Sequence, residues 1–190
     1  PLLKGKKVAV FANHTSVVGK SHLVDTLVKS GIDIKVIFAP EHGFRGTADA
    51  GEKIENVTDA KTGIPVISLY GKKRKPSAED LQGVDIMVFD IQDVGVRFYT
   101  YISSLEEYIE SAIEHNKPVM VLDRPNPNGF YVDGPVLEPP FKSFVGMQPV
   151  PVVYGMTIGE YAKMLVGERW VPILKNNSSV KEKTTKTISR

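Results

Sequence analysis

Residues 7–12 read Lys-Val-Ala-Val-Phe-Ala and are followed directly by Asn13-His14. A short apolar run of this kind is typical of a strand buried on both faces of a parallel sheet. Runs of the same kind recur along the chain at Ile34–Phe38, Pro65–Leu69, Val84–Phe89 and Pro118–Leu122. The sequence therefore predicts five buried strands.

Between these runs lie stretches whose apolar residues recur at helical spacing. Residues 23–28 predict a helix that stops at Ser30-Gly31, and residues 102–113 predict a longer helix with a capping box from Ser104 to Glu107. A second capping-box pattern, Thr157-Ile-Gly-Glu160, predicts a last helix. This alternation favours an α/β fold of the Rossmann-like, doubly wound kind, a mainly parallel sheet with helices on both faces.

The pattern indicates one domain, residues 1–170. Residues 123–151 interrupt the alternation with prolines and Asn-Gly and Asp-Gly turns, so we expect a long ordered loop or a small lobe there. After Trp170 both periodicities fade. Residues 171–190 are therefore expected to form a disordered tail.

Composition excludes several classes of protein. The 190 residues are 42% hydrophobic and 24% charged, enough apolar material for one core. The net charge of +2 comes from residues 175–190, which carry five cations and one anion. The rest of the chain has no stripe of basic residues, so nucleic acid is not expected as a partner. The absence of cysteine excludes disulfides and a Cys nucleophile. No apolar run is long enough for membrane insertion, and residues 1–5 lack a signal-peptide region.

Polar residues concentrate where the predicted strands end. Ligands of open α/β sheets bind outside the carboxyl ends of the strands. Four of the five predicted strands are followed there by charged or amide side chains: Asn13 and His14, Glu41 and His42, Asp90 and Asp93, and Asp123, Arg124 and Asn126. Turns of Gly, Ser and Asn would close a purely structural edge, so this concentration predicts a functional site.

Nucleotide and metal sites fit the sequence less well. Gly19-Lys20-Ser21 resembles the end of a phosphate-binding loop, but His14 stands where that loop needs glycine, and no G-x-G-x-x-G follows the first strand. His14, His42, Asp90 and Asp93 offer ligands for zinc or manganese, but nothing fixes their spacing. Both histidines are equally compatible with loop positions whose hydrogen bonds are satisfied. We expect no metal and no cofactor, and keep a metal-dependent hydrolase as a less favoured alternative.

General acid–base catalysis by carboxylates is the remaining chemistry, and glycoside hydrolysis requires it. Glu41 is the natural acid, because the second strand places it at the mouth of the site, where Phe44 supplies apolar surroundings. An alternative is that Glu41 pairs with Arg45. Asp90 and Asp93 could likewise cap the next turn.

Four motifs taken together resemble a known family. They are Phe11-Ala-Asn-His-Thr-Ser16, Ala39-Pro-Glu-His-Gly-Phe-Arg-Gly46, Phe89-Asp-Ile-Gln-Asp-Val-Gly-Val-Arg-Phe-Tyr-Thr-Tyr101 and Leu122-Asp-Arg-Pro-Asn-Pro127. This set, across residues 3–170, is similar to the NamZ family of bacterial exo-β-N-acetylmuramidases. The resemblance implies hydrolysis of non-reducing terminal N-acetylmuramic acid from peptidoglycan fragments, in cell-wall recycling, by a secreted or periplasmic protein.

The resemblance also suggests roles for residues. It implies Glu41 as the catalytic acid, and the catalytic candidates are Glu41, His42, Asp90 and Asp93. The candidates for binding a small carbohydrate substrate are Asn13, His14, Arg45, Arg97, Asp123, Arg124 and Asn126. An arginine among them could hold the lactyl carboxylate of muramic acid with two parallel hydrogen bonds. Tyr99 and Tyr101 either line a sugar platform or seal the core.

Members of the family continue into a C-terminal domain that closes the cleft, and the pattern after Trp170 does not show such a domain. Water exclusion and substrate positioning depend on both walls of a cleft. A second hypothesis is therefore a non-catalytic sugar-binding module.

Overall fold

The computed structural model describes residues 2–41, 43–46, 57–176 and 185–189. Its centre is a seven-stranded sheet in the order β5-β6-β4-β1-β7-β8-β9. The strands are β1 (Lys7–Ala12), β4 (Asp33–Ala39), β5 (Val57–Thr58), β6 (Pro65–Ser68), β7 (Ile86–Asp90), β8 (Val119–Asp123) and β9 (Thr185–Ser189). All neighbours pair in parallel except β5 and β6. A separate hairpin joins β2 (Val17–Val18) to β3 (Ser21–His22).

The chain winds outward from β1 in two directions. It passes from β1 to β4 and β6 on one side, then returns to β7 and continues to β8 and β9 on the other. The direction reverses between β1 and β7, which is the switch point of a doubly wound sheet. This topology confirms the predicted fold class.

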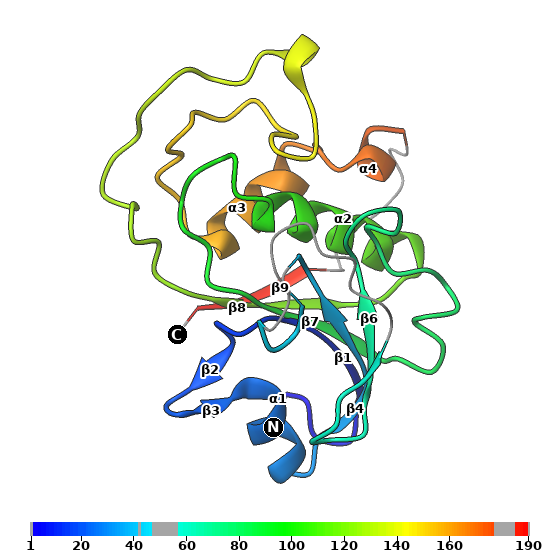
Figure 1. Cartoon of the computed structure of the whole chain (residues 1–190). Coiled ribbons are helices and arrows are strands. Elements are labelled where there is room, and N and C mark those ends of the chain that lie inside the picture. The colour runs from blue at the N-terminus through cyan, green and yellow to red at the C-terminus, as the bar shows by residue number, and fades with distance from the viewer. Residues whose placement is uncertain (1, 42, 47–56, 177–184, 190) are drawn as a thin grey trace.

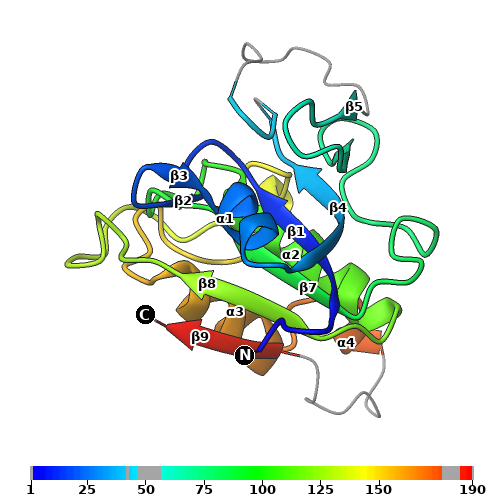
Figure 2. The same cartoon turned by 90° about the horizontal axis from the view of Figure 1, so that it is seen from below.

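Helices cover both faces of the sheet. Helix α1 (Leu23–Lys29) lies on one face, and α2 (Tyr101–Glu114), α3 (Ile158–Gly167) and the short α4 (Pro172–Asn176) lie on the other (Figure 1). The view from below shows α1 in front of the strands and α3 and α4 behind them (Figure 2). Successive strand residues alternate between the two apolar layers, so the sheet is buried on both sides.

An aromatic cluster fixes α2 on the strands. The ring of Phe11 stacks on Phe89 with centroids 4.9 Å apart, and Tyr108 of α2 meets Phe11 edge-on at 5.3 Å and Phe38 at 5.9 Å. All four rings are fully buried. Because these rings come from α2 and the three central strands, the start of α2 has a fixed position beside the carboxyl ends of those strands.

Most predicted elements are confirmed. All five predicted strands are present, the first with the same bounds, and the capping box of Thr157 and Glu160 forms at the start of α3. The predicted capping box from Ser104 to Glu107 is wrong. The N-cap residue of α2 is Thr100, four residues before Ser104, and the Ser104 N–H donates to the carbonyl of Thr100 within the helix.

Residues after β8 show one agreement and one difference. From Arg124 to Pro151 the only regular element is a single 3₁₀ turn, η1 (Pro139–Phe141), as expected for a long ordered loop. Residues 171–190 were expected to be disordered, but their described part contains α4 and β9. Strand β9 pairs in parallel along the whole of β8. An edge strand gains its hydrogen bonds from its neighbour's backbone, so a polar segment with few apolar side chains suffices.

None of the helices in the described ranges combines the length and the apolar character that a membrane span requires.

Candidate active site

Glu41 lies at the carboxyl edge of the sheet, two residues after β4 ends at Ala39. It lines a hollow of about 260 Å³ together with residues from the start of α2 and from the long loop: Phe98, Tyr99, Thr100, Tyr101 and Val145. Phe98 and Tyr99 are 56% and 47% exposed, and their ring centroids lie 6.1 Å apart. A carboxyl group therefore faces a hollow with two exposed aromatic rings, a surface suited to the apolar face of a sugar.

Two tyrosines flank Glu41 from different elements. The hydroxyl of Tyr70, just after β6, donates a hydrogen bond to the Glu41 carboxylate, and this bond raises the pKa of Tyr70 above its ordinary value. The charge of Glu41 also reaches the hydroxyl of Tyr101, the first residue of α2, whose pKa burial raises. The catalytic candidate Glu41 is thus held within a small polar cluster. Among the described residues, Arg45 contacts the carboxylates of Asp59 and Asp25.

Asn13 closes the crevice between β1 and β7. Its side-chain oxygen accepts from the Thr15 N–H at 2.9 Å and the Thr15 hydroxyl at 2.6 Å, while its Nδ2 donates to the Tyr101 hydroxyl at 3.3 Å. The Ser16 hydroxyl donates to the Asp90 carbonyl across the same crevice. Asn13 is fully buried, so it positions Tyr101 behind the Glu41 hollow.

Asp90 and Arg124 form an ion pair at the ends of β7 and β8. Arg124 Nε and Nη2 each lie 2.8 Å from one oxygen of the carboxylate. The pair borders a second hollow of about 210 Å³, together with Asp123, Pro125 and apolar residues of the β2–β3 hairpin and α1: Val17, Val18, Leu23 and Leu122. The structure thus separates this pair from the hollow that Glu41 lines.

Asp93 is a buried carboxyl group. One oxygen, Oδ2, accepts from the Tyr154 hydroxyl and from the Gly95 N–H at 2.8 Å. The other oxygen is buried and has no hydrogen-bond partner among the described residues. Burial raises the pKa of Asp93, and the bond from Tyr154 partly opposes this. Asp93 therefore shares its site with Tyr154, and its proposed part in catalysis stays a prediction.

The arginines expected to bind a lactyl carboxylate are engaged within the protein. Arg45 uses Nε and Nη2 on Asp59 and Nη2 also on Asp25. Its bonds to Asp59 are the main cause that lowers the pKa of Asp59 to about 2. Arg97 donates through Nη1 to the carbonyls of Pro135 and Val150. Arg124 is bonded to Asp90. All three arginines therefore have a partner within the protein, which a substrate carboxylate would have to displace or share.

Asp123 and Asn126 hold the start of α3 and the long loop. Asp123 accepts from the Gly159 N–H and the Thr157 hydroxyl, both at 2.8 Å. Asn126 donates to the Met156 carbonyl at 2.8 Å and accepts from the Asn128 N–H. These contacts give both side chains a structural role at the same edge of the sheet.

His14 is exposed and lies against Gly46, where an added Cβ would come within 2.9 Å of the His14 Cβ. The loop that carries Glu41 therefore rests on the loop after β1. His42 lies outside the described residues. Within the ranges that the structure describes, no three His, Asp or Glu side chains gather closely enough to hold a metal ion.

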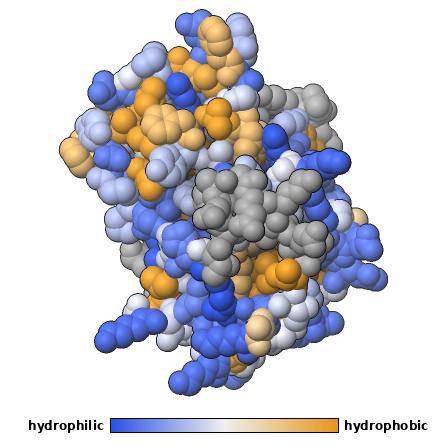
Figure 3. Space-filling model, viewed as in Figure 1, coloured by the Kyte–Doolittle hydropathy of each residue, from blue (hydrophilic) through white to orange (hydrophobic). Residues whose placement is uncertain are grey.

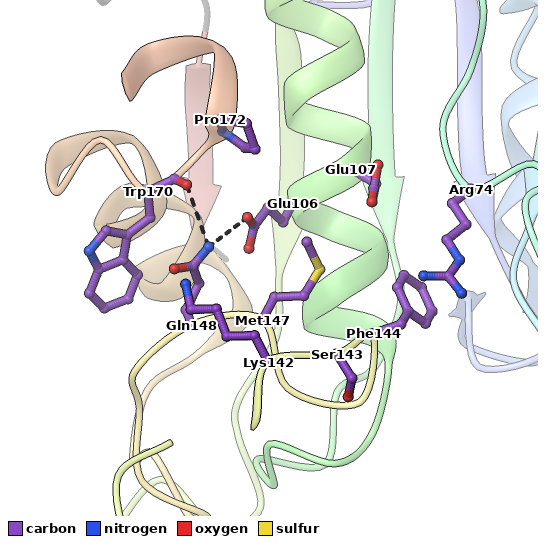
Figure 4. A pocket seen from close by; sticks show the side chains of 10 residues that line it. All are labelled: Arg74, Glu106, Glu107, Lys142, Ser143, Phe144, Met147, Gln148, Trp170 and Pro172. Carbon is purple, nitrogen blue, oxygen red and sulfur yellow. Dashed lines mark hydrogen bonds between the residues drawn. The ribbon is translucent and has the colours of Figure 1, made fainter. Parts of the chain in front are cut away.

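A third hollow of about 370 Å³ lies on the face of the sheet covered by α2 (Figure 4). There Gln148 Nε2 donates to Glu106 Oε1 at 2.6 Å, and the Arg74 guanidinium lies 4.3 Å from the centre of the Phe144 ring. Val145 lines the Glu41 hollow and Phe144 lines this one, so the same loop separates the two. Hydrophobic surface gathers in the upper left of Figure 3, where Figure 1 places the long loop.

Sequence reasoning missed Tyr70 and Tyr154. Tyr70 could have been found, because it follows the third predicted strand just as Glu41 follows the second. Tyr154 had no such signal, since it lies beyond the long loop and reaches Asp93 only through the folded chain.

Comparison with known proteins identifies the family. The family model described as "Exo-beta-N-acetylmuramidase NamZ, N-terminal" matches residues 8–188. The chain belongs to the NamZ N-terminal family. This membership confirms the resemblance carried by the four sequence motifs.

Relatives with names or structures agree with that assignment. "Peptidoglycan beta-N-acetylmuramidase NamZ" of Bacillus subtilis (strain 168) is 48% identical over 172 residues, which cover 85% of this chain and 40% of that protein. Two DUF1343 family proteins of Bacteroides fragilis NCTC 9343 have the same fold. One is 43% identical with a TM-score of 0.82, and the match covers 100% of this chain and 47% of that protein. The other is 39% identical with a TM-score of 0.85, and the match covers 98% of this chain and 45% of that protein. This chain therefore spans less than half the length of each of these three relatives.

Proposed function

We propose that this chain forms the Glu41-bearing half of an exo-β-N-acetylmuramidase, a glycoside hydrolase that releases non-reducing terminal N-acetylmuramic acid from peptidoglycan fragments. Membership of the NamZ family and the activity for which the Bacillus relative is named support the reaction class. The observation that carries the proposal is the position of Glu41, at the carboxyl edge of the sheet in a hollow with exposed aromatic rings.

Glu41 acts as the general acid in this proposal. Cleavage of a glycosidic bond leaves an alkoxide on the departing sugar, and a carboxylic acid that protonates the bridging oxygen removes that barrier. The sugar lies with its apolar face on Phe98 and Tyr99, which places its glycosidic bond toward Glu41. Asp90 is paired with Arg124 and Asp93 is bonded to Tyr154, and neither carboxylate is among the residues that line this hollow.

The test compares Glu41→Gln with Glu138→Gln, a change of the same kind at an exposed carboxylate in the long loop. Release of N-acetylmuramic acid from a disaccharide of N-acetylmuramic acid and N-acetylglucosamine is measured with the protein that carries this chain. Glu41→Gln is expected to lower kcat by roughly 10²–10⁴-fold, the usual contribution of a general acid, and Glu138→Gln to leave it unchanged. Equal rates for wild type and Glu41→Gln would remove Glu41 from the mechanism.

Two further arms separate the alternatives. Activity that persists in a chelator argues against a metal-dependent hydrolase. Calorimetry that detects binding of muramic acid glycosides, with no release of sugar, would instead indicate a sugar-binding module.

We further propose that the protein works outside the cytoplasmic membrane, in the periplasm or after secretion, and serves cell-wall recycling. The support is chemical, because its proposed substrate is a fragment of the wall. Cell fractionation followed by immunodetection tests the location, and detection only in the cytoplasmic fraction contradicts it.

A further inference from the structure

We propose that Tyr101 donates a hydrogen bond to the acetamido carbonyl of the sugar, because Asn13 directs the proton of the Tyr101 hydroxyl into the hollow that Glu41 lines. The inference rests on the proposed function, which brings an N-acetylmuramic acid residue into this hollow. It makes Tyr101 a specificity-determining residue, a choice that the sequence left open between a sugar platform and the core.

Backbone donors fix the direction of the hydrogen bonds around Asn13. Its side-chain oxygen accepts from the Thr15 N–H at 2.9 Å and from the Thr15 hydroxyl at 2.6 Å. A backbone N–H can only donate, so the side of the amide that faces Thr15 is the oxygen. The Gln92 N–H in turn donates to the Thr15 hydroxyl oxygen at 3.1 Å, which leaves the Thr15 proton for Asn13. The opposite side of the Asn13 amide is therefore Nδ2, which can only donate.

This direction carries over to Tyr101. Asn13 Nδ2 lies 3.3 Å from the Tyr101 hydroxyl oxygen, so that oxygen accepts. A phenolic hydroxyl has one proton to donate, and here the proton has to point away from Asn13. Within the described ranges the structure gives this proton no acceptor. Asn13 is fully buried, so a ligand in the hollow cannot compete for its amide.

Tyr101 forms part of the wall of the hollow. It is the first residue of α2, is only partly buried, and lines the hollow together with Glu41. The exposed ring of Tyr99 lies next to it, with ring centroids 6.4 Å apart. Burial raises the pKa of Tyr101, so its hydroxyl stays protonated at neutral pH. The hollow therefore offers a ligand a neutral donor beside an aromatic surface.

Sugar chemistry identifies the acceptor. The glycosidic bond leaves carbon 1 of N-acetylmuramic acid, the acetamido group is on carbon 2, and the lactyl ether is on carbon 3. Because Tyr101 shares the hollow with Glu41, the substituent within its reach is the one next to the bond that Glu41 protonates. The acetamido carbonyl is a neutral acceptor, whereas the lactyl carboxylate would place a second anion beside Glu41.

The test removes only the Tyr101 hydroxyl. Calorimetry measures the binding of N-acetylmuramic acid to the protein that carries this chain, and Tyr101→Phe is expected to weaken it roughly 3- to 10-fold. An analogue with hydrogen in place of the acetamido group should bind wild type and Tyr101→Phe with affinities within about two-fold of each other. Tyr131→Phe removes the hydroxyl of a tyrosine in the long loop and should bind both ligands as wild type does.

A second variant tests the direction of the hydrogen bonds. Asn13→Asp keeps the shape and the oxygen that accepts from Thr15, but it replaces Nδ2 with an acceptor. The Tyr101 proton would then go to the new carboxylate instead of the sugar. Asn13→Asp should therefore weaken binding of N-acetylmuramic acid at least as much as Tyr101→Phe, and the two changes together should add little more. Thermal unfolding checks that each variant folds, and the Tyr101→Phe comparison is decisive without Asn13→Asp.

Each contrary outcome overturns a stated part. Equal affinity of wild type and Tyr101→Phe for N-acetylmuramic acid overturns the proposal. An equal loss on the analogue without the acetamido group overturns that group as the acceptor, and wild-type binding by a folded Asn13→Asp overturns the hydrogen-bond direction. If the wild type does not bind N-acetylmuramic acid, the proposed function fails and this inference fails with it. Release of sugar that depends on Glu41, with no effect of Tyr101→Phe on binding, would remove Tyr101 alone.

Discussion

Asp90 and Arg124 close the ends of two neighbouring strands with a fork of two hydrogen bonds, each 2.8 Å long. The Asp90 side chain is 1% exposed and that of Arg124 is 24% exposed. Because Asp90 is the last residue of β7 and Arg124 directly follows the last residue of β8, the pair fixes the loops that leave both strands. A carboxylate expected to perform chemistry and an arginine expected to bind substrate are thus each other's partner.

Removal of the arginine should destabilise the fold. Arg124→Met leaves the buried Asp90 charge without its cation, so we expect the free energy of unfolding to fall by about 3 kcal/mol. Urea denaturation measures the change. The double variant Asp90→Leu with Arg124→Met should recover most of the loss, because an apolar pair can replace a buried ion pair. If the Arg124→Met variant unfolded at the same midpoint urea concentration as the wild type, this account would be contradicted.

Asp93 should make stability depend on pH. Burial raises the pKa of Asp93 above its ordinary 3.8, so the folded protein keeps this proton at pH values where the unfolded chain has lost it. The wild-type protein therefore loses stability as pH rises from about 4 through the raised pKa. Asp93→Asn keeps an acceptor for Tyr154 and Gly95 but carries no charge.

Consequently, the stability of Asp93→Asn relative to wild type should increase as pH rises from 4 and then level off. Urea denaturation of both proteins between pH 4 and 8 gives the difference, in which the other carboxylates cancel. A difference that stays constant over this range would show that Asp93 titrates alike in the folded and unfolded states.

Two glycines of α3 should respond in opposite directions to alanine. A Cβ at Gly159 would lie 2.5 Å from Cγ of Asp123, so Gly159→Ala must displace the carboxylate that caps the helix. We expect a loss of about 1–2 kcal/mol, the worth of a helix cap. Gly167 has no heavy atom within 4 Å of an added Cβ, so Gly167→Ala should stabilise by up to about 1 kcal/mol. Thermal unfolding of both variants distinguishes them, and equal shifts would be inconsistent with the contact to Asp123.

The exposed ring of Tyr99 should contribute to sugar binding. Tyr99→Ala removes an aromatic surface from the Glu41 hollow, and we expect affinity for N-acetylmuramic acid to weaken by roughly ten-fold, or about 1.4 kcal/mol. Calorimetry with the sugar measures it. Phe141→Ala, which removes a 70% exposed ring from η1, is the control and should bind as wild type. Similar affinity in all three proteins would place the sugar elsewhere.

The sequence was informative wherever local pattern decides the structure. Apolar runs predicted the five central strands, and the direction of parallel strands was enough to bring Glu41, Asp90 and Asp123 to one edge. The start of α2 was misplaced because Ser104 and Glu107 match a capping pattern, while burial of Ser104 against the core decides where the helix begins.

Contacts between residues of different elements could not be predicted from local sequence patterns. Nothing near Asp90 in the chain indicates that Arg124 binds it, because the contact depends on which strand lies next to β7. The same holds for β9, whose polar residues gain order from the open edge of β8. Tyr70 carries neither a charge nor an amide, so the pattern of charged and amide side chains at the strand ends does not include it.

Trp170, the chain's single tryptophan, packs against the α2 side of the core and borders the hollow of Gln148. The Glu41 hollow contains tyrosines and a phenylalanine instead. Fluorescence excited at the red edge of protein absorption comes from Trp170 alone. It therefore reports unfolding of the helical layer and changes little when a sugar binds in the Glu41 hollow. The fold thus supplies its own unfolding probe, and ligand titrations with this protein call for a tyrosine-directed or calorimetric signal.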